Sequence, residues 1–315
     1  MREFINKTKL IMGDFNRRKF LKATTLLMAV PFAPNFFDVK KTKPLLAFST
    51  LGCPDWNFHK ITDFAVQHNY KGIELRGLLR EMDFTKCPEF SPQNIAATLA
   101  LMKDKNLAFA DLGASTNLHI ADSAERKKNL DEAKSFIDLA QKINCPHVRV
   151  FPNRLPKDQD KNATMDLITK GLLELGDYAK GSNVSVLMET HGDLVWSEDI
   201  EKIMQASFNA HTGLVWDITN MWSITKEPPV EVYQKIKKYI RHTHIKDLKM
   251  VNGKEDYALL GEGEVPIFTA IDALQKGGYK GYYSFEWEKL WHPEIAEPEI
   301  ALPQYSKVML EHFNK

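Results

Sequence analysis

Residues 184–192, Val-Ser-Val-Leu-Met-Glu-Thr-His-Gly, form a short apolar run that ends in polar residues. A β-branched, apolar run of this length predicts a buried strand. A segment beginning Ser197-Glu198-Asp199 follows it, and this pattern predicts Ser197 as the N-cap of a helix with acidic residues in its first turn. The stretch therefore predicts a strand that runs directly into a helix.

The same strand-then-helix unit recurs along the chain, which predicts a parallel sheet. The predicted strands span residues 45–50, 72–76, 107–112, 147–151, 184–189, 213–217, 240–245 and 282–286. The predicted helices include residues 91–105 (starting at Ser91-Pro92), 123–143, 165–180 and a closing helix at 297–313. Eight such units are the count of a single α/β (β/α)8 TIM barrel, which we expect over residues 44–315.

A doubly wound open sheet is the alternative fold. Such a sheet usually carries a glycine-rich phosphate loop after its first strand. Residues 51–55, Leu-Gly-Cys-Pro-Asp, do not have that pattern. The barrel is therefore the favoured fold.

The composition of the 315-residue chain limits its partners. Apolar residues make up 43% of it, enough for a sizeable core. The 42 Lys and Arg residues nearly balance 41 Asp and Glu residues, and a net charge of +1 indicates no basic surface for nucleic acid. No apolar stretch approaches the roughly 20 residues of a membrane span. Three cysteines are too few for a disulfide scaffold, so we expect Cys53, Cys87 and Cys145 to be buried.

Residues 1–43 have the pattern of an export signal and are expected to lie outside the barrel. Residues 16–22, Asn-Arg-Arg-Lys-Phe-Leu-Lys, precede the mildly apolar residues 23–33. Paired arginines before a short apolar stretch resemble the twin-arginine signal, which exports folded proteins. We therefore expect a periplasmic or exported protein. An amphipathic helix with a basic start is the alternative.

Polar residues end the last four predicted strands, where active sites of such barrels lie. Glu189, Asp217, His244 and Glu286 occupy these ends at intervals of 28, 27 and 42 residues, the last lengthened by residues 249–265. Each residue alone could have an ordinary structural role, as a helix cap or a loop carboxylate. Three carboxylates and an imidazole from adjacent strands together predict a site for one Mn²⁺, Mg²⁺, Co²⁺ or Zn²⁺.

These strand ends resemble those of the xylose isomerase-like TIM-barrel superfamily of sugar phosphate isomerases and epimerases. The resemblance covers about residues 45–290 and rests on Met188–Gly192, Trp216–Asn220, His244–Asp247, Phe285–Trp287, Gly261–Val265 and Gly72–Arg76. It implies that Glu189, Asp217, His244 and Glu286 bind one metal ion, commonly manganese, and that Glu189 and Glu286 double as the acid/base pair. Many members have a substrate-contacting histidine where this chain has Asn220, which can donate a hydrogen bond but cannot transfer a proton.

Other polar residues near the strand ends are candidates for substrate binding. Lys246 and Arg149 have the charge to bind sugar oxygens, or each is a structural ion-pair partner. Glu74 is expected to point into the barrel beside Arg76, with an internal salt bridge between them as the alternative. The predicted substrate-binding residues are Glu74, His119, Arg149, His191, Trp196, Asn220, Lys246 and Trp287.

Four tryptophans, Trp196, Trp222, Trp287 and Trp291, follow strands or end them. Indole faces pack well on sugar C–H surfaces, although buried aromatic residues also stabilise cores. We expect two or three of the four in the pocket. Trp216, next to an inward-facing aspartate, is expected to face the helices by strand alternation.

The predicted site suits proton transfer next to a sugar carbonyl. Glu189 and Glu286 could take a proton from one face of the carbon and return it from the other, with the metal stabilising the enediolate. This predicts a sugar isomerase or epimerase. If the next carbon carries a leaving group, the same deprotonation makes a lyase or dehydratase acting on a keto-sugar or 3-keto-glycoside. Export and the missing phosphate loop favour an unphosphorylated sugar.

Two further classes are weaker alternatives. A non-catalytic exported sugar-binding protein would keep the tryptophans but needs no pair of convergent glutamates. An abasic-site endonuclease of the same superfamily uses three zinc ions, which needs a basic groove and more ligands in the first half than His119 and Asp111. We expect a small-molecule sugar as partner, no nucleic acid and no membrane insertion of the mature chain, and we leave a homo-oligomer open.

Overall fold

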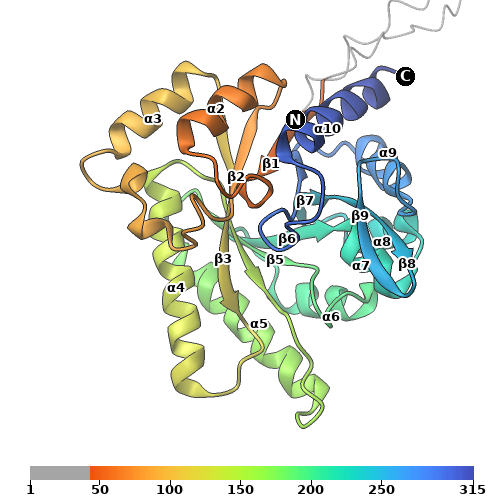
Figure 1. Cartoon of the computed structure of the whole chain (residues 1–315). Helices are drawn as coiled ribbons and strands as arrows, with labels where there is room; N and C mark the ends of the chain where they lie inside the picture. The colour runs from red at the N-terminus through yellow and green to blue at the C-terminus, as the bar shows by residue number, and fades with distance from the viewer. Residues whose placement is uncertain (1–42) are drawn as a thin grey trace, which may run out of the picture. The chain divides into compact units, whose positions relative to one another are not determined.

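The computed structural model describes residues 43–315, to which the structural statements below refer. Eight parallel strands close into a barrel in the order β1-β10-β7-β6-β5-β4-β3-β2 (Figure 1). The predicted α/β TIM barrel is therefore confirmed. The barrel strands are β1 (Leu45–Ser49), β2 (Gly72–Leu75), β3 (Ala108–Asn117), β4 (His147–Phe151), β5 (Ser185–Glu189), β6 (Thr212–Asp217), β7 (Ile240–Ile245) and β10 (Tyr282–Phe285).

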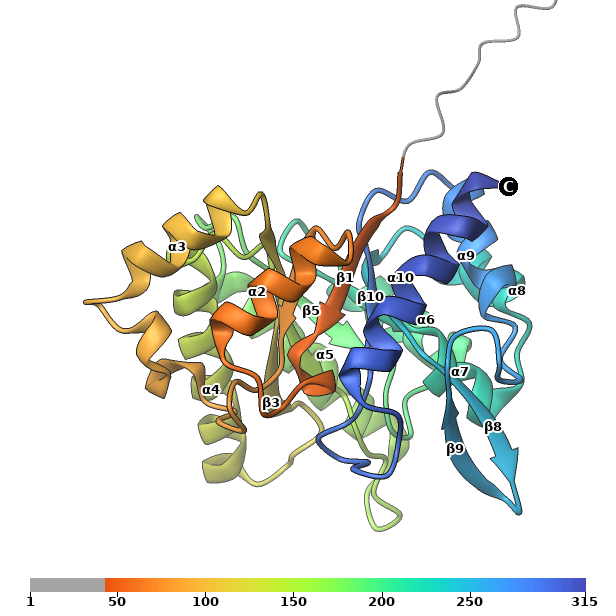
Figure 2. The same cartoon turned by 45° about the horizontal axis from the view of Figure 1, so that its top comes forward.

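Helices cover the outside of the barrel. In Figure 2, α2 and α10 lie over β1 and β10, and the Tyr305 hydroxyl of α10 donates to the Tyr283 carbonyl of β10 at 3.0 Å. No helix in residues 43–315 is long and apolar enough to cross a membrane. The helices are α2 (Phe58–Gln67), α3 (Ile95–Asp104), α4 (Ser123–Lys142), α5 (Lys161–Tyr178), α6 (Ser197–Ser207), α7 (Ile218–Thr225), α8 (Pro229–Ile236), α9 (Ile267–Lys276) and α10 (Pro298–Asn314), with short 3-10 turns at Thr50–Gly52, Phe84–Lys86 and Pro88–Phe90.

Strand alternation separates the barrel interior from the layer under the helices. Trp216 of β6 is 1% exposed and stacks on Tyr233 of α8 with ring centroids 6.1 Å apart. Its predicted orientation toward the helices is confirmed. The three cysteines are buried and unpaired, as expected.

Two helix starts differ from their predictions. Helix α3 begins at Ile95 rather than Ser91, because residues 91–94 form a turn that the Asn94 N–H closes by donating to the Ser91 carbonyl at 3.1 Å. Helix α6 begins at Ser197 itself, with Trp196 as the preceding cap residue. The Ser197 hydroxyl donates to Glu227 at 2.5 Å, so it contributes to tertiary packing instead of capping the helix.

An antiparallel hairpin of β8 (Asp247–Val251) and β9 (Lys254–Ala258) lies between β7 and α9, where the sequence predicts only a lengthened connection. Asn252 and Gly253 form its turn with φ of 52° and 76°. Positive φ at both central residues is the geometry that Asn-Gly favours in two-residue hairpins. Figure 2 shows the hairpin projecting away from the end at which β1 begins.

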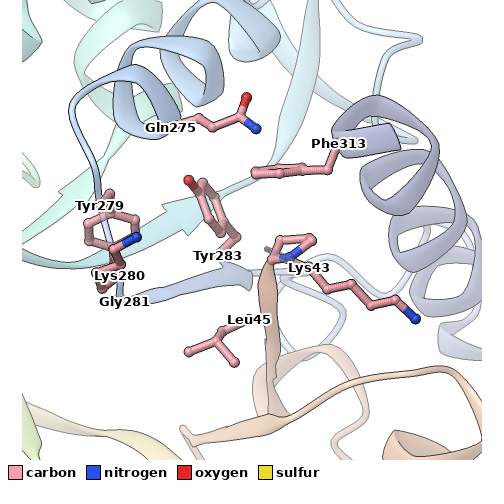
Figure 3. Close-up of a pocket in the computed structure, with 9 residues that line it drawn as sticks. Lys43, Leu45, Gln275, Tyr279, Lys280, Gly281, Tyr283 and Phe313 are labelled. Carbon is pink, nitrogen blue, oxygen red and sulfur yellow. The ribbon is translucent and has the colours of Figure 1, made fainter. Parts of the chain in front are cut away.

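A hollow of about 300 Å³ lies at the opposite end of the barrel from the predicted site. Figure 3 shows Leu45, Tyr283 and Phe313 around it, and Lys43 at its edge. Leu45 begins β1, and Tyr283 lies at the start of β10, so the hollow is next to the N-terminal ends of the strands. None of the predicted site residues lines it. The predicted export signal lies outside the described residues except for Lys43.

Candidate metal centre

Four side chains from adjacent strands meet at the C-terminal end of the barrel. Glu189 ends β5, Asp217 ends β6, His244 lies near the end of β7, and Glu286 directly follows β10. One ligand atom of each lies within 4.8 Å of the others, and all four side chains are buried. The structure thus brings together the four residues that the strand ends predict.

The donor set fits a divalent cation. Nδ1 of His244 lies 3.2 Å from Glu286 Oε1, 3.4 Å from Glu189 Oε1 and 4.0 Å from Asp217 Oδ2. Glu189 Oε2 and Asp217 Oδ2 are buried and make ion-pair contacts with Arg149 and Lys246, and the buried His244 Nδ1 has no hydrogen-bond partner. Such an atom is costly unless a ligand or water binds it, and imidazole and carboxylate suit Zn²⁺, Mn²⁺ and Mg²⁺ to different degrees. These residues therefore fit a single divalent ion.

The ammonium group of Lys246 lies against the same carboxylates. Its Nζ is 2.6 Å from Glu286 Oε2, 2.9 Å from Asp217 Oδ2 and 2.6 Å from Glu288 Oε1. Burial lowers the pKa of Lys246, but Asp217 and Glu286 outweigh it and raise the pKa well above its usual range. Lys246, predicted to bind substrate or to form ion pairs, is thus a buried counter-charge for the cluster.

The carboxylates of the cluster differ in their tendency to ionise. Burial raises the pKa of Asp217 to about 7, although Lys246 acts in the opposite direction. Burial also raises the pKa of Glu286, but His244 and Lys246 outweigh it and hold that pKa well below its usual range. Against the effect of burial, His244 and Arg149 lower the pKa of Glu189. Glu189 and Glu286 are therefore ionised at neutral pH, as a base requires.

Two arginines add positive charge beside Glu189. Nε of Arg149 lies 3.1 Å from Glu189 Oε2, and its guanidinium stacks 3.9 Å from the centroid of Phe151. Burial and the nearby Arg149 lower the pKa of Arg76 to about 9. Gly113 leaves room for both side chains, since a Cβ there would lie 2.7 Å from Arg149 Nη2 and 2.8 Å from Arg76 Cδ.

Glu74 lies in the barrel interior, with no exposed surface. Its Oε2 accepts hydrogen bonds from His242 Nε2 at 2.9 Å, His244 Nε2 at 3.1 Å and Ser284 Oγ at 2.8 Å. Within residues 43–315 no ion pair joins Glu74 to Arg76, the alternative that the sequence left open. Three buried donors therefore hold the Glu74 carboxylate in the barrel interior, beside His244.

Asp217 has two roles, because its other oxygen caps the next helix. Oδ1 accepts from the backbone N of Asn220 at 2.8 Å, in the first turn of α7. The Thr190 hydroxyl accepts from Asp217 N at 2.9 Å and donates to Asp217 O at 3.1 Å. The Thr219 hydroxyl donates to Lys246 O at 2.6 Å. The start of α7 therefore fixes the backbone of both β6 and β7 beside the cluster.

Histidines of the neighbouring loops lie in different settings. His191 Nδ1 lies 2.7 Å from Asn153 Oδ1, and its ring packs on Phe151 with centroids 4.6 Å apart. Asn153, which follows β4, also hydrogen-bonds Asn117. His119 is half-buried, and burial lowers its pKa. His191, predicted to bind substrate, thus has a side-chain partner in Asn153.

The tryptophans near the site separate into exposed and buried ones. Trp196 and Trp291 lie in the loops after β5 and β10 and are 49% and 52% exposed. Trp222 of α7 is half-buried. Trp287 is 1% exposed, and its indole N–H donates to Ala296 O at 2.8 Å. The structure therefore places Trp287 in the core beside α10, and leaves the exposed pair accessible.

Sequence reasoning did not select three residues that the structure places here. Glu288 and Arg76 each lie two residues after a selected glutamate, so strand period alone would have placed them on the same side. Asn153 lies in an irregular loop after β4, for which the sequence carries no such signal.

Comparison with known proteins agrees with this geometry. Residues 62–304 match the model of the xylose isomerase-like TIM barrel family. The chain belongs to this family. The match confirms the resemblance that the strand ends indicate.

Proteins similar to this chain include enzymes of two reaction types. Fructoselysine 3-epimerase of Shigella flexneri is 21% identical over 207 residues, covering 64% of this chain and 71% of the relative. Inosose dehydratase of Geobacillus thermodenitrificans (strain NG80-2) is 26% identical over 155 residues, covering 44% of this chain and 51% of the relative. The chain is thus similar to sugar epimerases and to dehydratases.

Among solved structures, the IOLI protein with a binding zinc atom superposes with a TM-score of 0.70 at 19% identity. The superposition covers 84% of this chain and 97% of that protein. At this identity the likeness establishes the shared fold.

Proposed function

We propose that the protein is a divalent-metal-dependent isomerase or epimerase of an unphosphorylated sugar. The observation that carries the proposal is the convergence of Glu189, Asp217, His244 and Glu286 within 4.8 Å. In the barrel order β5-β6-β7-β10, the two glutamates lie at the ends of this row, with the aspartate and histidine between them. A sugar carbon held over the row would have one ionised carboxylate on each side.

The four residues would hold one divalent ion, manganese first, with zinc supported by the IOLI structure. The ion would supply Lewis acidity to a sugar carbonyl and its neighbouring hydroxyl. Arg149 and Lys246 flank the ligand row, within hydrogen-bond distance of Glu189 and Glu286 respectively. Their positive charges keep both glutamates ionised and add to the stabilisation of an enediolate.

The proposed proton transfers need only the two glutamates. One takes the proton from the carbon next to the carbonyl, and the bonding electrons pass into the enediolate. The other glutamate takes up a proton from water and returns it to the opposite face of the same carbon, which yields the epimer. Return to the neighbouring carbon yields the ketose–aldose isomer. No proton donor is needed from Asn220, consistent with its amide side chain.

A second reaction type, dehydration of a keto-sugar or 3-keto-glycoside, is favoured by the similarity to an inosose dehydratase. Glu189 or Glu286 would again remove the proton next to the carbonyl. The enediolate would then expel hydroxide from the adjacent carbon, and a proton donor would convert it to water. The glutamate that took up the carbon-bound proton can return it to the departing hydroxide, so that water leaves and the carboxylate is ionised again.

The deciding experiment incubates the protein with a panel of ketoses and 3-keto-glycosides in D₂O with Mn²⁺. Deuterium at the carbon next to the carbonyl and a new epimer, both seen by NMR, support the epimerase. An unsaturated product with release of water supports the dehydratase. Binding of sugars without exchange of any carbon-bound proton would overturn both and indicate a sugar-binding protein.

Metal content tests the centre separately. We expect about one equivalent of Mn, Zn or Co in purified protein, lost in His244→Ala because one of four ligands is removed. Elemental analysis measures this, and a wild type that takes up no ion and gains no thermal stability from added Mn²⁺, Mg²⁺, Zn²⁺ or Co²⁺ contradicts the proposal.

We also propose that the chain is exported through the twin-arginine route, the basis for favouring an unphosphorylated sugar. Replacement of Arg17 and Arg18 by lysine should leave the protein in the cytoplasm. Cell fractionation measures this, and unchanged export of the variant contradicts the proposed route.

A further inference from the structure

We infer that Glu74 is a positioning residue that directs Nδ1 of His244 at the metal centre. The inference rests on the metal centre of the proposed function, but not on its substrate. Glu74 Oε2 accepts hydrogen bonds from Nε2 of His244 at 3.1 Å, from Nε2 of His242 at 2.9 Å and from the Ser284 hydroxyl at 2.8 Å. All four side chains have no exposed surface, so water cannot replace these bonds.

The chemistry of the imidazole ring explains how a carboxylate acts at this distance. A carboxylate accepts hydrogen bonds and has none to donate, so the His244 nitrogen facing Glu74 carries the N–H. In a neutral imidazole the other nitrogen, Nδ1, then holds the free electron pair. Nδ1 is the atom that lies 3.2 Å from Glu286 Oε1 and 3.4 Å from Glu189 Oε1. Glu74 thus fixes both the tautomer and the direction of the metal-binding atom.

The barrel is built so that Glu74 can reach His244 from another strand. Glu74 lies on β2, and β1 and β10 separate it from His244 on β7. The residues in register with His244 are Ser284 on β10 and, beyond it, Ala47 on β1. Partners in register share a face of the sheet, so two small side chains line the space that Glu74 crosses. His242, two residues before His244, holds the carboxylate from the same strand.

A second metal ion is the alternative use of Glu74, His242 and His244, whose ligand atoms also lie within 4.8 Å of one another. His244 would then need a free electron pair on both ring nitrogens, which only a fully deprotonated imidazolate has. A neutral ring can serve one of the two clusters. Three carboxylates surround Nδ1, so the cluster of Glu189, Asp217, His244 and Glu286 is the one that holds the metal. The N–H on Nε2 of His244 is then left to Glu74.

The inference is tested by metal binding in the full chain, with no sugar present. Glu74→Ala should bind Co²⁺ and Zn²⁺ about 10–100-fold more weakly than the wild type, because the His244 ring loses its fixed tautomer. The visible absorption spectrum of bound Co²⁺ should also change, since ligand direction sets its bands. Glu74→Gln keeps an acceptor oxygen and should restore much of the affinity. Asp111→Asn is the matched control: it changes the buried carboxylate in register with Glu74, but Asp111 bonds neither histidine.

Nitrogen chemical shifts of the histidines in the Zn²⁺-loaded protein identify the tautomer directly. A proton on His244 Nε2 with Zn²⁺ on Nδ1 is the expected result. Equal affinity and an unchanged Co²⁺ spectrum in a folded Glu74→Ala protein would overturn the inference, as would uptake of two equivalents by the wild type. If the wild type exchanges no sugar protons, the proposed reaction is wrong but the inferred role of Glu74 is unaffected. If the wild type binds no metal ion, both the proposed function and the role of Glu74 are wrong.

Discussion

Glu189 and Glu286, the two glutamates of the candidate metal centre, have different positively charged neighbours. Glu189 has a guanidinium beside it, and Glu286 has an ammonium. Arginine stays charged in nearly all settings, whereas a lysine can give up its proton to a reacting group. Here Asp217 and Glu286 raise the pKa of Lys246 well above its usual range, so each of the two glutamates has a neighbour that stays positively charged.

Removal of either carboxylate charge should stop proton exchange. We expect Glu189→Gln and Glu286→Gln each to lower the rate of deuterium incorporation about 10²–10⁴-fold, because an amide cannot act as a base. NMR of an exchanging sugar measures the rate, and thermal unfolding of each variant serves as the control for folding. A variant that exchanges as fast as the wild type would remove its glutamate from the acid/base pair.

Lys246 should stabilise the cluster most when no metal is bound. Lys246→Met leaves Asp217, Glu286 and Glu288 without their shared cation, and breaking such a buried pair costs about 3–5 kcal/mol. Added Mn²⁺ should recover more of the melting temperature in this variant than in the wild type. Lys134→Met, which breaks a partly exposed pair with Glu174, is the control and should cost under about 1 kcal/mol. Calorimetry with and without chelator measures both, and equal losses would contradict the prediction.

At the scale of the element, Asp247 connects the β8–β9 hairpin to the chain that leads into α9. Its carboxylate accepts from the backbone N of Leu248, Gly261, Gly263 and Val265 at 2.9–3.3 Å. One buried side chain therefore satisfies four backbone donors and holds the glycine loop against the end of β7. The hairpin starts directly after Lys246, and Asp247 holds the later loop at Gly261–Val265 against the same strand end.

Gly263 should tolerate no side chain. A Cβ there would lie 1.9 Å from Asp247 Oδ1 and 2.6 Å from Leu248 O, so Gly263→Ala must displace the carboxylate or the loop. We expect a loss of about 1–3 kcal/mol in urea unfolding. Gly253→Ala at the hairpin turn is the control: it meets nothing within 4 Å and carries only the strain of its φ of 76°, roughly 1–2 kcal/mol. A smaller loss at Gly263 than at Gly253 would show that Asp247 is not held rigidly.

At the scale of the whole molecule, the barrel interior is polar and charged beneath the metal centre. Asp111 is fully buried beside Glu74 in register, and neither of its carboxylate oxygens has a hydrogen-bond partner. Burial raises the pKa of Asp111 to about 6, with Glu74 adding to the rise and His242 opposing it. The folded protein thus binds this proton more tightly than the unfolded chain does.

Stability should therefore fall as the pH rises through the interval between the two pKa values of Asp111. The buried, protonated Asp111 contributes its full stabilisation below about pH 3.8, its pKa in the unfolded chain. This stabilisation is lost as the pH rises past about 6, its pKa in the folded protein. Asn at position 111 cannot ionise, so the free energy of unfolding of Asp111→Asn should rise relative to that of the wild type between pH 4 and pH 7. The expected relative rise is on the order of 2–3 kcal/mol. Urea unfolding at both pH values measures the gain. A difference between the two proteins that does not change with pH would contradict the prediction.

The sequence by itself predicted the barrel and the four residues of the candidate metal centre. Short apolar strand runs, each followed by a helix-period segment, are local features, and parallel strands put their last residues at one end of a barrel. That topology alone predicts that Glu189, Asp217, His244 and Glu286 converge. The hairpin at Asn252-Gly253 also had a local signal, but its charged strands lacked the apolar pattern of the barrel strands.

Only the tertiary structure decided what surrounds the four residues. Glu74 and His244 are 170 residues apart, and their hydrogen bond depends on the closure of the barrel between β1 and β10. The contact of Lys246 with Glu288, and the burial of Trp287 under α10, likewise depend on which side chain fills which space. Local pattern specifies the strand and the face on which a residue lies, whereas its partner across the barrel is set by packing in three dimensions.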